Sequence, residues 1–493
     1  MRRIDVHDLA DNASFNRFHV RVLAWCLLVI IIDGYDIAVA GAALPAIMKD
    51  MGVEASTAGF MASSALFGMM FGAIFLGALS DRIGRKATIS LCVFLFSVFT
   101  AAAGLTNDPV TFSVTRFIAG LGIGGVMPNI VAQMTEYSPR KIRSFMTTVM
   151  FSGYAIGGIL AALIGKQFIA GFGWQIVFLA AGVPVLLIPF ILKSMPESLS
   201  YLASRANQAR LRQAVAQIDP SFQFSASDTF VAEQQGQATG APLARLFQDG
   251  RGVSTVMFWV AFFTGLFMIY ALSTWLTKLM AMAGYSLGSA LSFVIALNLG
   301  AVIGAIGGGW LADRFHIKWV LVWMYALGAA FLYMMTIKTS TEVLYLIIAA
   351  VGACTTGAQI VAYAYSGQFY PGPVRSTGVG MASGVGRLGA IAAPMLIGVI
   401  VSLKLPLQQN FLVIGAAGLV GALALRDWLA RWPLPVSITS APHPARRRLT
   451  AAGLPRRLPA QATDPVEHRG RAATTPPDPG ATPIRFSSSL RYP

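Results

Sequence analysis

Two acidic residues lie near the middle of a long apolar run. Asp33 and Asp36 are three residues apart within the run 22–47. On a helix this spacing places them about 60° apart around the axis and roughly 4.5 Å apart along it, so both side chains can face one cavity. Two close carboxylates in a low dielectric favour the binding of a proton by one of them, which predicts a site that exchanges protons. The alternative is that one aspartate caps a helix break at Gly34.

Two arginines also lie inside apolar runs. Arg116 is near the start of the run 110–134, and Arg387 stands within V-G-R-L-G in the run 376–402. An arginine within a membrane needs a carboxylate partner, supplied either by the protein or by a substrate. Its planar guanidinium group suits a carboxylate anion. The alternative for both residues is that the side chain extends toward the membrane surface.

Charged residues also stand at the ends of apolar runs in two similar segments, GALSDRIGRK (77–86) and GWLADRFHIK (309–318). Charges on tight loops can pair with neighbouring helix ends in one conformation only, which would make them gates rather than substrate ligands. Simple basic decoration of a loop does not explain an aspartate in both segments. The candidate gate residues are Asp81, Arg82, Arg85, Asp313, Arg314 and Arg375. Glu136 follows the run 110–134 and is either a conformational ion pair or an ordinary interfacial acid.

Membrane-spanning helices are the elements that must position these residues. The chain has 493 residues, of which 55% are hydrophobic and only 12% are charged. Soluble domains carry roughly 25% charged residues. Apolar runs of about 20 residues recur along most of the chain, and each is long enough to cross a bilayer. This pattern excludes a soluble enzyme, a disordered scaffold and a secreted disulfide protein, and it predicts an all-α integral membrane protein.

Hydropathy predicts twelve spans in two sets of six. They cover about 22–47, 57–79, 87–106, 110–134, 144–166, 174–192, 253–276, 287–311, 319–337, 343–366, 376–402 and 408–430. The predicted organisation is an N-terminal segment (1–21), a six-helix bundle (22–193), a central loop (194–252), a second six-helix bundle (253–430) and a disordered Arg/Pro-rich tail (431–493). The N-terminus and the even-numbered loops hold 19 Lys and Arg residues and the odd-numbered loops hold five. This bias predicts that both termini and the central loop are cytoplasmic.

The two sets of spans are related to each other in sequence. Gly77 and Gly309 are 232 residues apart (309 − 77). The same offset carries Asp81, Gly120, Gly125, Pro139 and Arg143 onto Asp313, Gly352, Gly357, Pro371 and Arg375. Such an internal duplication is typical of transporters whose site lies between the repeats near the membrane midplane.

These motifs resemble those of a known superfamily. GALSDRIGRK (77–86) is close to the G-x-L-x-D-R-x-G-R-K motif of the major facilitator superfamily, and RFIAGLGIGGVMPN (116–129) and PES (196–198) support the resemblance, which covers about 20–430. D-G-Y-D (33–36) is similar to the D-G-x-D of its aromatic acid/proton symporter family. The resemblance implies twelve helices around a central cavity between two halves. It also implies import of a benzoate- or 4-hydroxybenzoate-type carboxylate with protons, by alternating access, across a bacterial inner membrane.

The resemblance also implies roles for individual residues. In the family both carboxylates matter for transport, which carries over to Asp33 and Asp36. The arginine that begins the span-4 motif is associated with proton coupling, which points to Arg116. Arg387 matches a span-11 arginine of the family and is the candidate partner of the substrate carboxylate. With Glu136, these are the candidate coupling or substrate residues. The second loop copy departs from the motif, since His316 replaces its glycine and no Arg-Lys pair follows.

Spans 1, 4, 7 and 10 usually line the cavity of such a transporter. The candidate lining residues are Tyr35, Asn129, Tyr270, Gln359 and Tyr363. A flat substrate ring could stack on the aromatic residues among them. The competing interpretation is that aromatic residues within spans serve packing or anchor the helix at the membrane interface.

Several other functions are not expected. The net charge of +16 comes from the loops and the Arg-rich tail, so no nucleic-acid site is predicted. Gly120, Gly122 and Gly125 match G-x-G-x-x-G, but they lie in an apolar span with no preceding strand. No ATP-binding motif occurs, and none of the five histidines lies in a predicted span or near another plausible ligand. We therefore expect no metal and no cofactor, a proton gradient as the energy source, and a monomer.

Two alternatives remain at this point. The chain could carry another organic anion, a sugar or a drug; the intramembrane arginines favour an anion, and D-G-Y-D favours aromatic acids over sugars. It could also be a transporter-like sensor that binds without transport. A sensor should carry a signalling domain, and neither 194–252 nor 431–493 resembles one.

Overall fold

The computed structural model describes residues 2–427, apart from 206, 226–227, 233–245, 249, 338 and 371. Within this range the side chains of a few further residues are not described, among them Asp81, Asp313 and Arg375. The predicted disordered tail, 431–493, lies outside the described residues.

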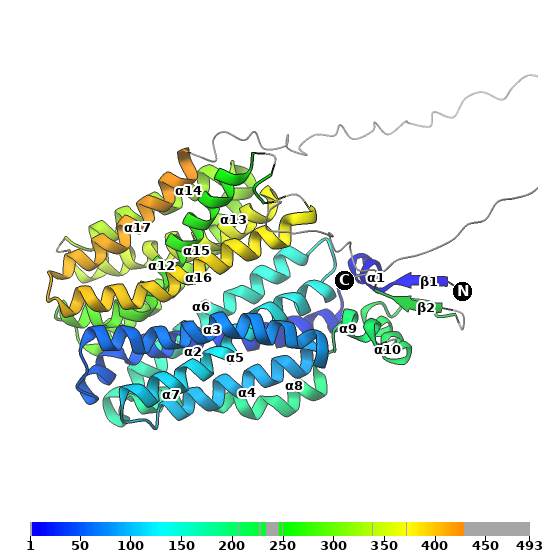
Figure 1. Cartoon of the computed structure of the whole chain (residues 1–493), viewed down its shortest axis with the longest axis horizontal. Helices are drawn as coiled ribbons and strands as arrows, with labels where there is room; N and C mark the ends of the chain where they lie inside the picture. The colour runs from blue at the N-terminus through cyan, green and yellow to red at the C-terminus, as the bar shows by residue number, and fades with distance from the viewer. Residues whose placement is uncertain are drawn as a thin grey trace, which may run out of the picture. The chain divides into compact units, whose positions relative to one another are not determined.

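Twelve helical segments among the described residues are long and apolar enough to cross a membrane, as the sequence predicts (Figure 1). The first half contains α2 (Arg17–Asp50), α3 (Ala55–Ile83), α4 (Arg85–Ala103), α5 (Pro109–Tyr137), α6 (Arg143–Phe172) and a broken sixth segment. The second half contains α12 (Gly252–Met282), α13 (Leu287–Arg314), α14 (Ile317–Met334), α15 (Thr341–Phe369), α16 (Gly372–Ser402) and α17 (Leu407–Asp427).

Several helices extend beyond the predicted apolar windows. The helix α2 begins five residues before its window because Asn16 caps it, accepting a 2.9 Å hydrogen bond from the Phe18 amide. His19 completes this capping box, so the prediction that no histidine lies in a span is wrong for His19. The sixth segment is divided into α7 (Gln175–Ala180), the 3₁₀ helix η1 (Val183–Leu187) and α8 (Ile188–Ser194). Pro184 and Pro189 lack the amide hydrogen that a continuous helix needs.

The internal duplication is preserved in the helix crossings. In each half, glycines bring two helices so close that a Cβ atom would overlap a carbonyl oxygen of the neighbour. A Cβ on Gly68 would lie 2.1 Å from the oxygen of Phe117, and a Cβ on Gly300 would lie 1.8 Å from that of Ala349. The same relationship occurs twice more: Gly72–Leu121 corresponds to Gly304–Ala353, and Gly157–Ile31 corresponds to Gly389–Phe263. In every pair both members are shifted by 232 residues, so the two halves share one set of backbone crossings.

Contacts between the two halves lie toward one end of the bundle, the end that bears Asp50 and Phe172, which we call the closed end. Here a Cβ on Gly41 would lie 1.9 Å from the Ser273 carbonyl oxygen. A Cβ on Gly59 would lie 2.4 Å from that of Pro394. Two hydrogen bonds also join the halves, from Ser63 Oγ to the Ile391 carbonyl (3.0 Å) and from Lys166 Nζ to Ser292 Oγ (2.9 Å). These contacts bring α2, α3 and α6 against α12, α16 and α13.

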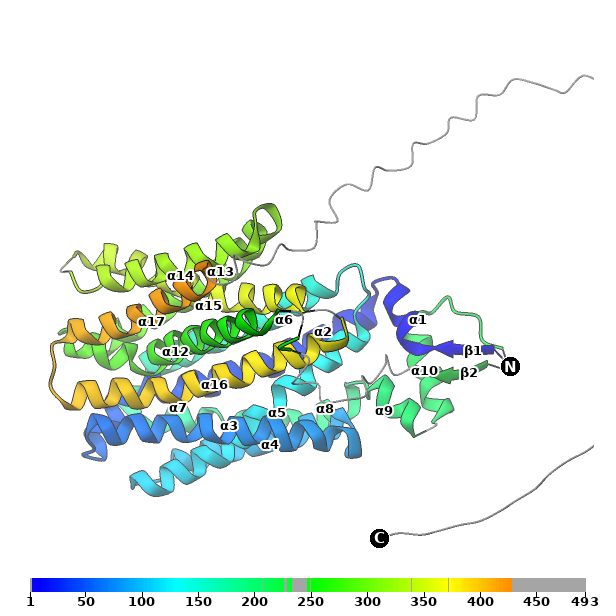
Figure 2. The ribbon, with the colours of Figure 1, turned by 45° about the horizontal axis from the view of Figure 1, so that its top comes forward.

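A small mixed structure, which we call the cap, lies at the opposite end of the first half (Figures 1 and 2). It comprises β1 (Arg2–Asp5), α1 (Val6–Asn12), α9 (Leu199–Ser204), α10 (Gln208–Ile218) and β2 (Asp228–Val231). The two strands pair in parallel, with Ile4 opposite Phe230. Val6, Val215 and Phe230 are buried in its core. The cap is anchored to the bundle because the Asn16 side chain donates to the Ile218 carbonyl (2.9 Å). This sheet is not expected from the sequence pattern.

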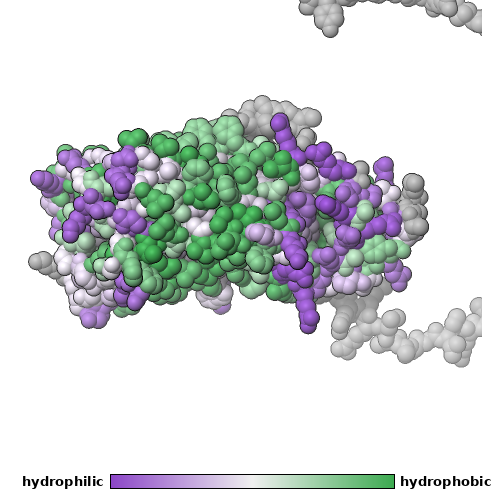
Figure 3. All heavy atoms as spheres, turned by 90° about the horizontal axis from the view of Figure 1, so that it is seen from below, coloured by the Kyte–Doolittle hydropathy of each residue, from purple (hydrophilic) through white to green (hydrophobic). Residues whose placement is uncertain are grey.

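The surface of the bundle fits a membrane environment. Figure 3 shows a band of hydrophobic residues across the middle of one face, with hydrophilic residues at both ends. Large apolar side chains are exposed within the spans, such as Ile303 (68%) and Leu346 (72%). A soluble protein rarely exposes so large an apolar surface. The chain is therefore a multi-pass membrane protein.

Candidate functional site

The carboxylate of Asp36 is held by an arginine in the interior of the first half. Asp36 on α2 and Arg116 on α5 are 1% and 2% exposed. Arg116 Nη1 lies 3.0 Å from Asp36 Oδ2 and donates a 2.7 Å hydrogen bond to Thr100 Oγ1 of α4. Its Nη2 donates to the Asp36 backbone carbonyl at 3.1 Å. The alternative that Arg116 extends to the membrane surface is therefore excluded.

Asp33 has a different partner on a different helix. The hydroxyl of Tyr154, on α6, donates a 2.6 Å hydrogen bond to Asp33 Oδ2. Asp33 is fully buried, and among the described residues its Oδ1 has no hydrogen-bond partner. The two aspartates remain within electrostatic range of each other. Although they are only three residues apart on one helix, the two aspartates have different sets of contacts.

The two residues between the aspartates serve the packing of α2. A Cβ on Gly34 would lie 2.6 Å from the Tyr154 carbonyl oxygen, so this position allows α6 to approach. The helix is continuous from Arg17 to Asp50, which argues against a helix break at Gly34. Tyr35 donates a 2.8 Å hydrogen bond to the Val177 carbonyl of α7. Tyr35 is therefore bound to a neighbouring helix, and its predicted place in the cavity lining is not supported by this contact.

Arg387 belongs to the second half and faces the first. It is half-buried on α16, and its Nη2 lies 4.0 Å from the Met127 sulfur of α5. Asp33 and Tyr270 both lie within electrostatic range of its guanidinium group. Among the described residues, no carboxylate forms an ion pair with Arg387, whereas Arg116 has Asp36. Within the described part of the chain, Arg387 is thus an intramembrane cation that no acidic side chain neutralises by direct contact.

A pocket between the halves adjoins these charges. It is formed by α2, α3 and α5 of the first half and α12 of the second. Its walls are mostly apolar: Ile37, Ala40, Ala62, Ala65, Leu66, Met69 and Ile123. The polar residues at its edge are Arg116, Tyr270 and Thr274. Of the predicted lining residues, Tyr270 is the one that the structure places at this pocket.

The other three predicted lining residues contact protein groups. Tyr363 shares a 2.9 Å hydrogen bond with Ser383 of α16. Asn129 donates to the Gly125 carbonyl of its own helix at 2.8 Å. Gln359 is 4% exposed, and within the described part of the chain neither polar atom of its amide has a hydrogen-bond partner. Its oxygen lies 2.2 Å from where a Cβ on Gly265 would stand, so it points into the packing between α15 and α12.

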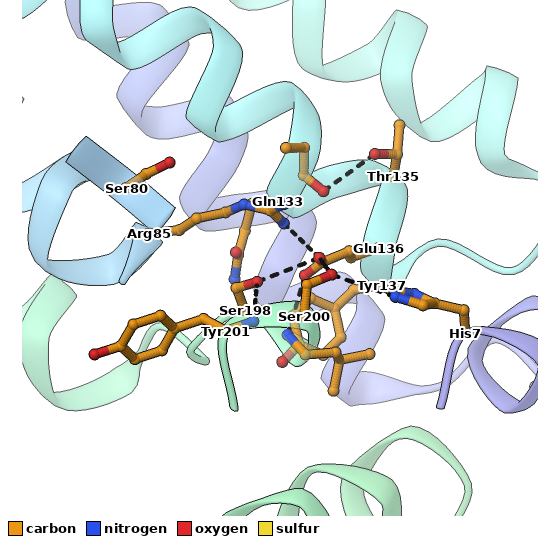
Figure 4. A network of polar contacts seen from close by, with 12 residues as sticks. His7, Ser80, Arg85, Gln133, Thr135, Glu136, Tyr137, Ser198, Ser200 and Tyr201 are labelled. Atoms are coloured by element: carbon orange, nitrogen blue, oxygen red, sulfur yellow. Dashed lines mark hydrogen bonds and ion pairs between the residues drawn. The ribbon is translucent and has the colours of Figure 1, made fainter. Parts of the chain in front are cut away.

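Glu136 belongs to a second polar cluster, at the end of α5 next to the cap (Figure 4). Arg85 Nη1 lies 2.7 Å from Glu136 Oε1. The carboxylate also accepts hydrogen bonds from the Leu199 amide (3.0 Å) and from Ser200 Oγ (2.5 Å). Glu136 follows Arg116 by 20 residues on one helix, which separates them by about 30 Å. The structure therefore does not bring Glu136 together with the other candidate coupling residues.

The P-E-S segment is the partner of this second cluster. Gln133 donates to the Pro196 carbonyl at 2.7 Å, and the Tyr137 hydroxyl donates to the Glu197 carbonyl at 2.5 Å. Glu197 in turn accepts a hydrogen bond from the Lys86 amide at 3.2 Å. These contacts tie α4, α5 and the start of the central segment together within the first half.

The predicted gate residues are only partly described. Arg85 is in the second cluster. Arg82 is exposed, and its carbonyl accepts a 3.0 Å hydrogen bond from Arg205. Arg314 is exposed and lies over the Trp310 ring, 5.6 Å from its centroid. The side chains of Asp81, Asp313 and Arg375 lie outside the described residues, so the gate remains a prediction.

Sequence reasoning missed Tyr154 and Thr100. Neither is charged, and each acquires its role only because a distant helix carries an aspartate or arginine to it. The flanking glycines Gly153 and Gly157 were a usable signal, since small residues mark close helix crossings. Among the described residues, no group of three His, Cys, Asp or Glu side chains could hold a metal ion.

Known proteins similar to this chain are transporters. A benzoate transport protein of Acinetobacter baylyi is 43% identical over 446 residues, which cover 88% of this chain and 96% of that protein. The 4-hydroxybenzoate transporter PcaK of Pseudomonas aeruginosa is 32% identical over 86% of this chain and 96% of its own length. A gallate transporter of Pseudomonas putida is 32% identical over 86% of this chain and 94% of its own length.

Solved structures show the same fold. The inward open xylose transporter XylE from E. coli aligns with a TM-score of 0.64 at 18% identity, over 83% of this chain and 96% of that one. A bacterial homologue of the lysosomal transporter Spinster, inward-facing and unoccupied, aligns with a TM-score of 0.61 at 17% identity, over 85% of this chain and 100% of that one. The family model of the Major Facilitator Superfamily matches residues 26–316 and 292–466. The chain is therefore a transport protein rather than an enzyme, and it belongs to the Major Facilitator Superfamily, where it resembles the aromatic acid/proton symporters.

Proposed function

We propose that this protein imports an aromatic carboxylate of the benzoate class by proton symport. One observation carries the proposal: a buried carboxylate with an unpartnered oxygen, Asp33, lies within electrostatic range of an intramembrane arginine, Arg387, that has no carboxylate in contact among the described residues. The first group suits a proton and the second suits an anion. The energy source is then the proton gradient, with no cofactor.

The energetics require a coupled cation. Moving a monoanion into a cell with a negative interior costs roughly 2.3 kcal/mol per 100 mV, and one co-transported proton cancels that cost. The two aspartates offer places for the proton. Asp36 is neutralised by Arg116, whereas Asp33 accepts one hydrogen bond from a neutral tyrosine. We propose that Asp33 is the residue whose proton compensates the charge of the substrate.

The lining of this pocket suits a flat apolar ring with a single charge, although its volume of about 20 Å³ holds little more than a water molecule, so the halves must move apart for a ring to enter. Its walls are aliphatic, and Tyr270, within electrostatic range of Arg387, stands at its edge. A ring placed here could stack on Tyr270 while its carboxylate pairs with Arg387. Benzoate is our first candidate, because the benzoate transport protein is 43% identical and the two transporters of hydroxylated acids described above are both 32% identical.

The distribution of charge favours one orientation. Basic residues gather at the cap end of the spans, which the positive-inside rule assigns to the cytoplasm. The closed end is then external, and the arrangement of the halves is inward-facing. Alternating access would require the crossings at Gly41 and Gly59 to separate and the opposite end to close. We propose that the protein works as a monomer in a bacterial inner membrane, with both termini in the cytoplasm.

Uptake of labelled benzoate and 4-hydroxybenzoate into energised cells tests the proposal. We expect accumulation of benzoate that is abolished by an uncoupler and by Asp33→Asn. The matched control is Asp228→Asn, which changes an aspartate in the cap, outside the spans. Normal expression with no uptake of either acid would contradict the proposed substrate class. Uptake that resists the uncoupler would contradict proton coupling alone.

A further inference from the structure

The contact between Tyr154 and Asp33 is short and partly buried. The hydroxyl oxygen lies 2.6 Å from Asp33 Oδ2, within the range of hydrogen bonds from a hydroxyl to a charged carboxylate. Asp33 is 0% exposed, and within the described part of the chain its other oxygen has no partner. A single tyrosine therefore supplies the hydrogen bond that the described residues give to this carboxylate.

The position of the Tyr154 hydroxyl is fixed by backbone packing. The helices α2 and α6 cross at Gly34 and Gly157. A Cβ on Gly34 would lie 2.6 Å from the Tyr154 carbonyl oxygen, and a Cβ on Gly157 would lie 2.2 Å from that of Ile31. The Tyr154 ring also stacks on Phe151, with centroids 6.4 Å apart and planes at 14°. The glycine of D-G-Y-D thus allows the helix that carries the hydrogen-bond donor to reach the aspartate beside it.

The pair also lies where the two halves meet. Both Tyr154 and Asp33 are within electrostatic range of Arg387 on α16, and Tyr154 is also within range of Tyr270 on α12. Asp36, the other nearby acid, is in an ion pair with Arg116. A change of charge at Asp33 therefore changes the electrostatic environment of Arg387, which we propose binds the substrate carboxylate.

We propose that Tyr154 is a positioning residue for the proton-carrying carboxylate. It holds Asp33 Oδ2 by its hydroxyl and leaves Oδ1 as the atom that takes the proton. The proton forms an O–H bond at Oδ1 on loading and leaves from the same atom on release, while Tyr154 keeps its own hydrogen throughout. This inference deepens the proposed proton symport and rests on it, and it adds a residue on α6 that the motif in α2 does not contain.

The decisive variant is Tyr154→Phe, which keeps the ring and its stacking but removes the donor. The matched control is Tyr325→Phe, which removes a buried tyrosine hydrogen bond to the Ala261 carbonyl (2.7 Å) in the second half. Labelled benzoate is measured in proteoliposomes in two modes. Uphill uptake driven by a pH gradient needs a proton to be bound and released in each cycle. Exchange against internal unlabelled benzoate needs no net release of protons.

We expect Tyr154→Phe to slow uphill uptake about tenfold, the scale of one hydrogen bond to a charged group, and to slow exchange less than about twofold. In the Asp33→Asn background, where uphill uptake is already lost and exchange is the readout, Tyr154→Phe should have no further effect, because the tyrosine acts through the aspartate. Uphill uptake at the wild-type rate in Tyr154→Phe would overturn the inference. An equal loss in both modes would also overturn it, since that is what misfolding produces.

Infrared spectroscopy of the purified protein gives a readout that does not depend on the substrate. The carbonyl band of protonated Asp33 is identified by its absence in Asp33→Asn. We expect the frequency of this band and its titration with pH to change in Tyr154→Phe and to remain unchanged in Tyr325→Phe. An unaltered band in Tyr154→Phe would refute the positioning role. If wild-type protein exchanges no benzoate, the proposed substrate fails, and the infrared result still decides the role of Tyr154.

Discussion

The guanidinium group of Arg116 contacts both the side chain and the backbone of Asp36. Nη1 lies 3.0 Å from the carboxylate and Nη2 lies 3.1 Å from the carbonyl oxygen of the same residue. One guanidinium group therefore fixes the position of the α2 backbone as well as the charge on it. Thr100 on α4 accepts a third hydrogen bond, so three helices of the first half meet at this arginine. A point charge could not make these contacts in one fixed plane.

Removal of the arginine alone should destabilise the protein more than removal of the pair. Arg116→Ala leaves a buried carboxylate without a counter-charge, and breaking a buried ion pair in this way costs about 3–5 kcal/mol. We expect a lower Tm for Arg116→Ala in purified protein. The double variant Arg116→Ala/Asp36→Asn should recover much of that Tm, because no unpaired charge remains.

Uptake measured on the same two variants distinguishes a loss of stability from a loss of transport. We expect proton-driven benzoate uptake to be lost in Arg116→Ala. It should also be lost in the double variant, although the Tm of that variant is largely restored. Recovery of uptake together with Tm would show that the pair is only structural. A Tm of Arg116→Ala equal to that of wild type would contradict the burial of an unpaired charge.

The duplicated crossings should respond alike to substitution. A Cβ on Gly72 would lie 2.0 Å from the Leu121 carbonyl oxygen, and a Cβ on Gly304 would lie 2.2 Å from that of Ala353. Forcing a methyl group into either crossing should cost about 1–3 kcal/mol. We therefore expect Gly72→Ala and Gly304→Ala to lower the Tm by similar amounts.

Gly307 provides the control for this prediction on the same helix as Gly304. A Cβ added there would meet nothing within 4 Å. Gly307→Ala should leave the Tm unchanged or raise it slightly, since alanine favours the helix. If Gly307→Ala is as harmful as Gly304→Ala, the effect comes from helix propensity or lipid contact and not from the crossing.

The sequence could predict features that depend on local patterns. The number of spans follows from runs of apolar residues, and the duplication follows from glycines at a constant offset, such as Gly68 and Gly300. Asp33 and Asp36 could be found because a charged residue inside an apolar run is conspicuous. The structure confirms the twelve spans and places the aspartates in the interior of the first half.

Features that depend on distant contacts could not be predicted. Tyr154 is 121 residues from Asp33, and an uncharged tyrosine in an apolar span carries no signal of its own. The cap depends on the pairing of Ile4 with Phe230 in strands of four residues, too short for a reliable alternation. Glu136 is a candidate coupling residue by sequence, yet the length of α5 separates it from Arg116.

The closed end should open when a side chain is added at Gly41. A Cβ at this position would lie 1.9 Å from the Ser273 carbonyl oxygen of the other half. We expect Gly41→Val to keep the halves apart there and to reduce net benzoate uptake about tenfold, which corresponds to about 1.4 kcal/mol. A cysteine at Thr274, which borders the pocket, should then react faster with a membrane-impermeant thiol reagent added outside right-side-out vesicles.

Gly171 is the control at the same end of the bundle. A Cβ added there would meet nothing within 4 Å, so Gly171→Val should change neither uptake nor the labelling of Thr274→Cys. The native cysteines, Cys26, Cys92 and Cys354, are buried and should contribute little labelling. Unchanged labelling in Gly41→Val would contradict the assignment of the closed end to the outer face.

The second cluster should hold the cap to the first half. Glu136 accepts hydrogen bonds from the Leu199 amide and Ser200 in addition to its ion pair with Arg85. Glu136→Gln removes the charge and weakens each of these contacts, which are strengthened by it. We expect faster amide hydrogen exchange across Leu199–Ser204 in the variant, since local opening no longer has to break an ion pair.

Arg205→Ala is the control, because it shows whether any loss of charge at this surface loosens the cap. Arg205 donates a hydrogen bond to the Arg82 carbonyl in an exposed position, and exposed contacts of this kind add about 0–1 kcal/mol. Arg205→Ala should therefore leave exchange in Leu199–Ser204 close to wild type. If both variants raise exchange equally, the cap is held by its surface charge. If Glu136→Gln alone raises it, the buried carboxylate is the anchor, and the end of α5 and Leu199–Ser204 move as one body with the first half.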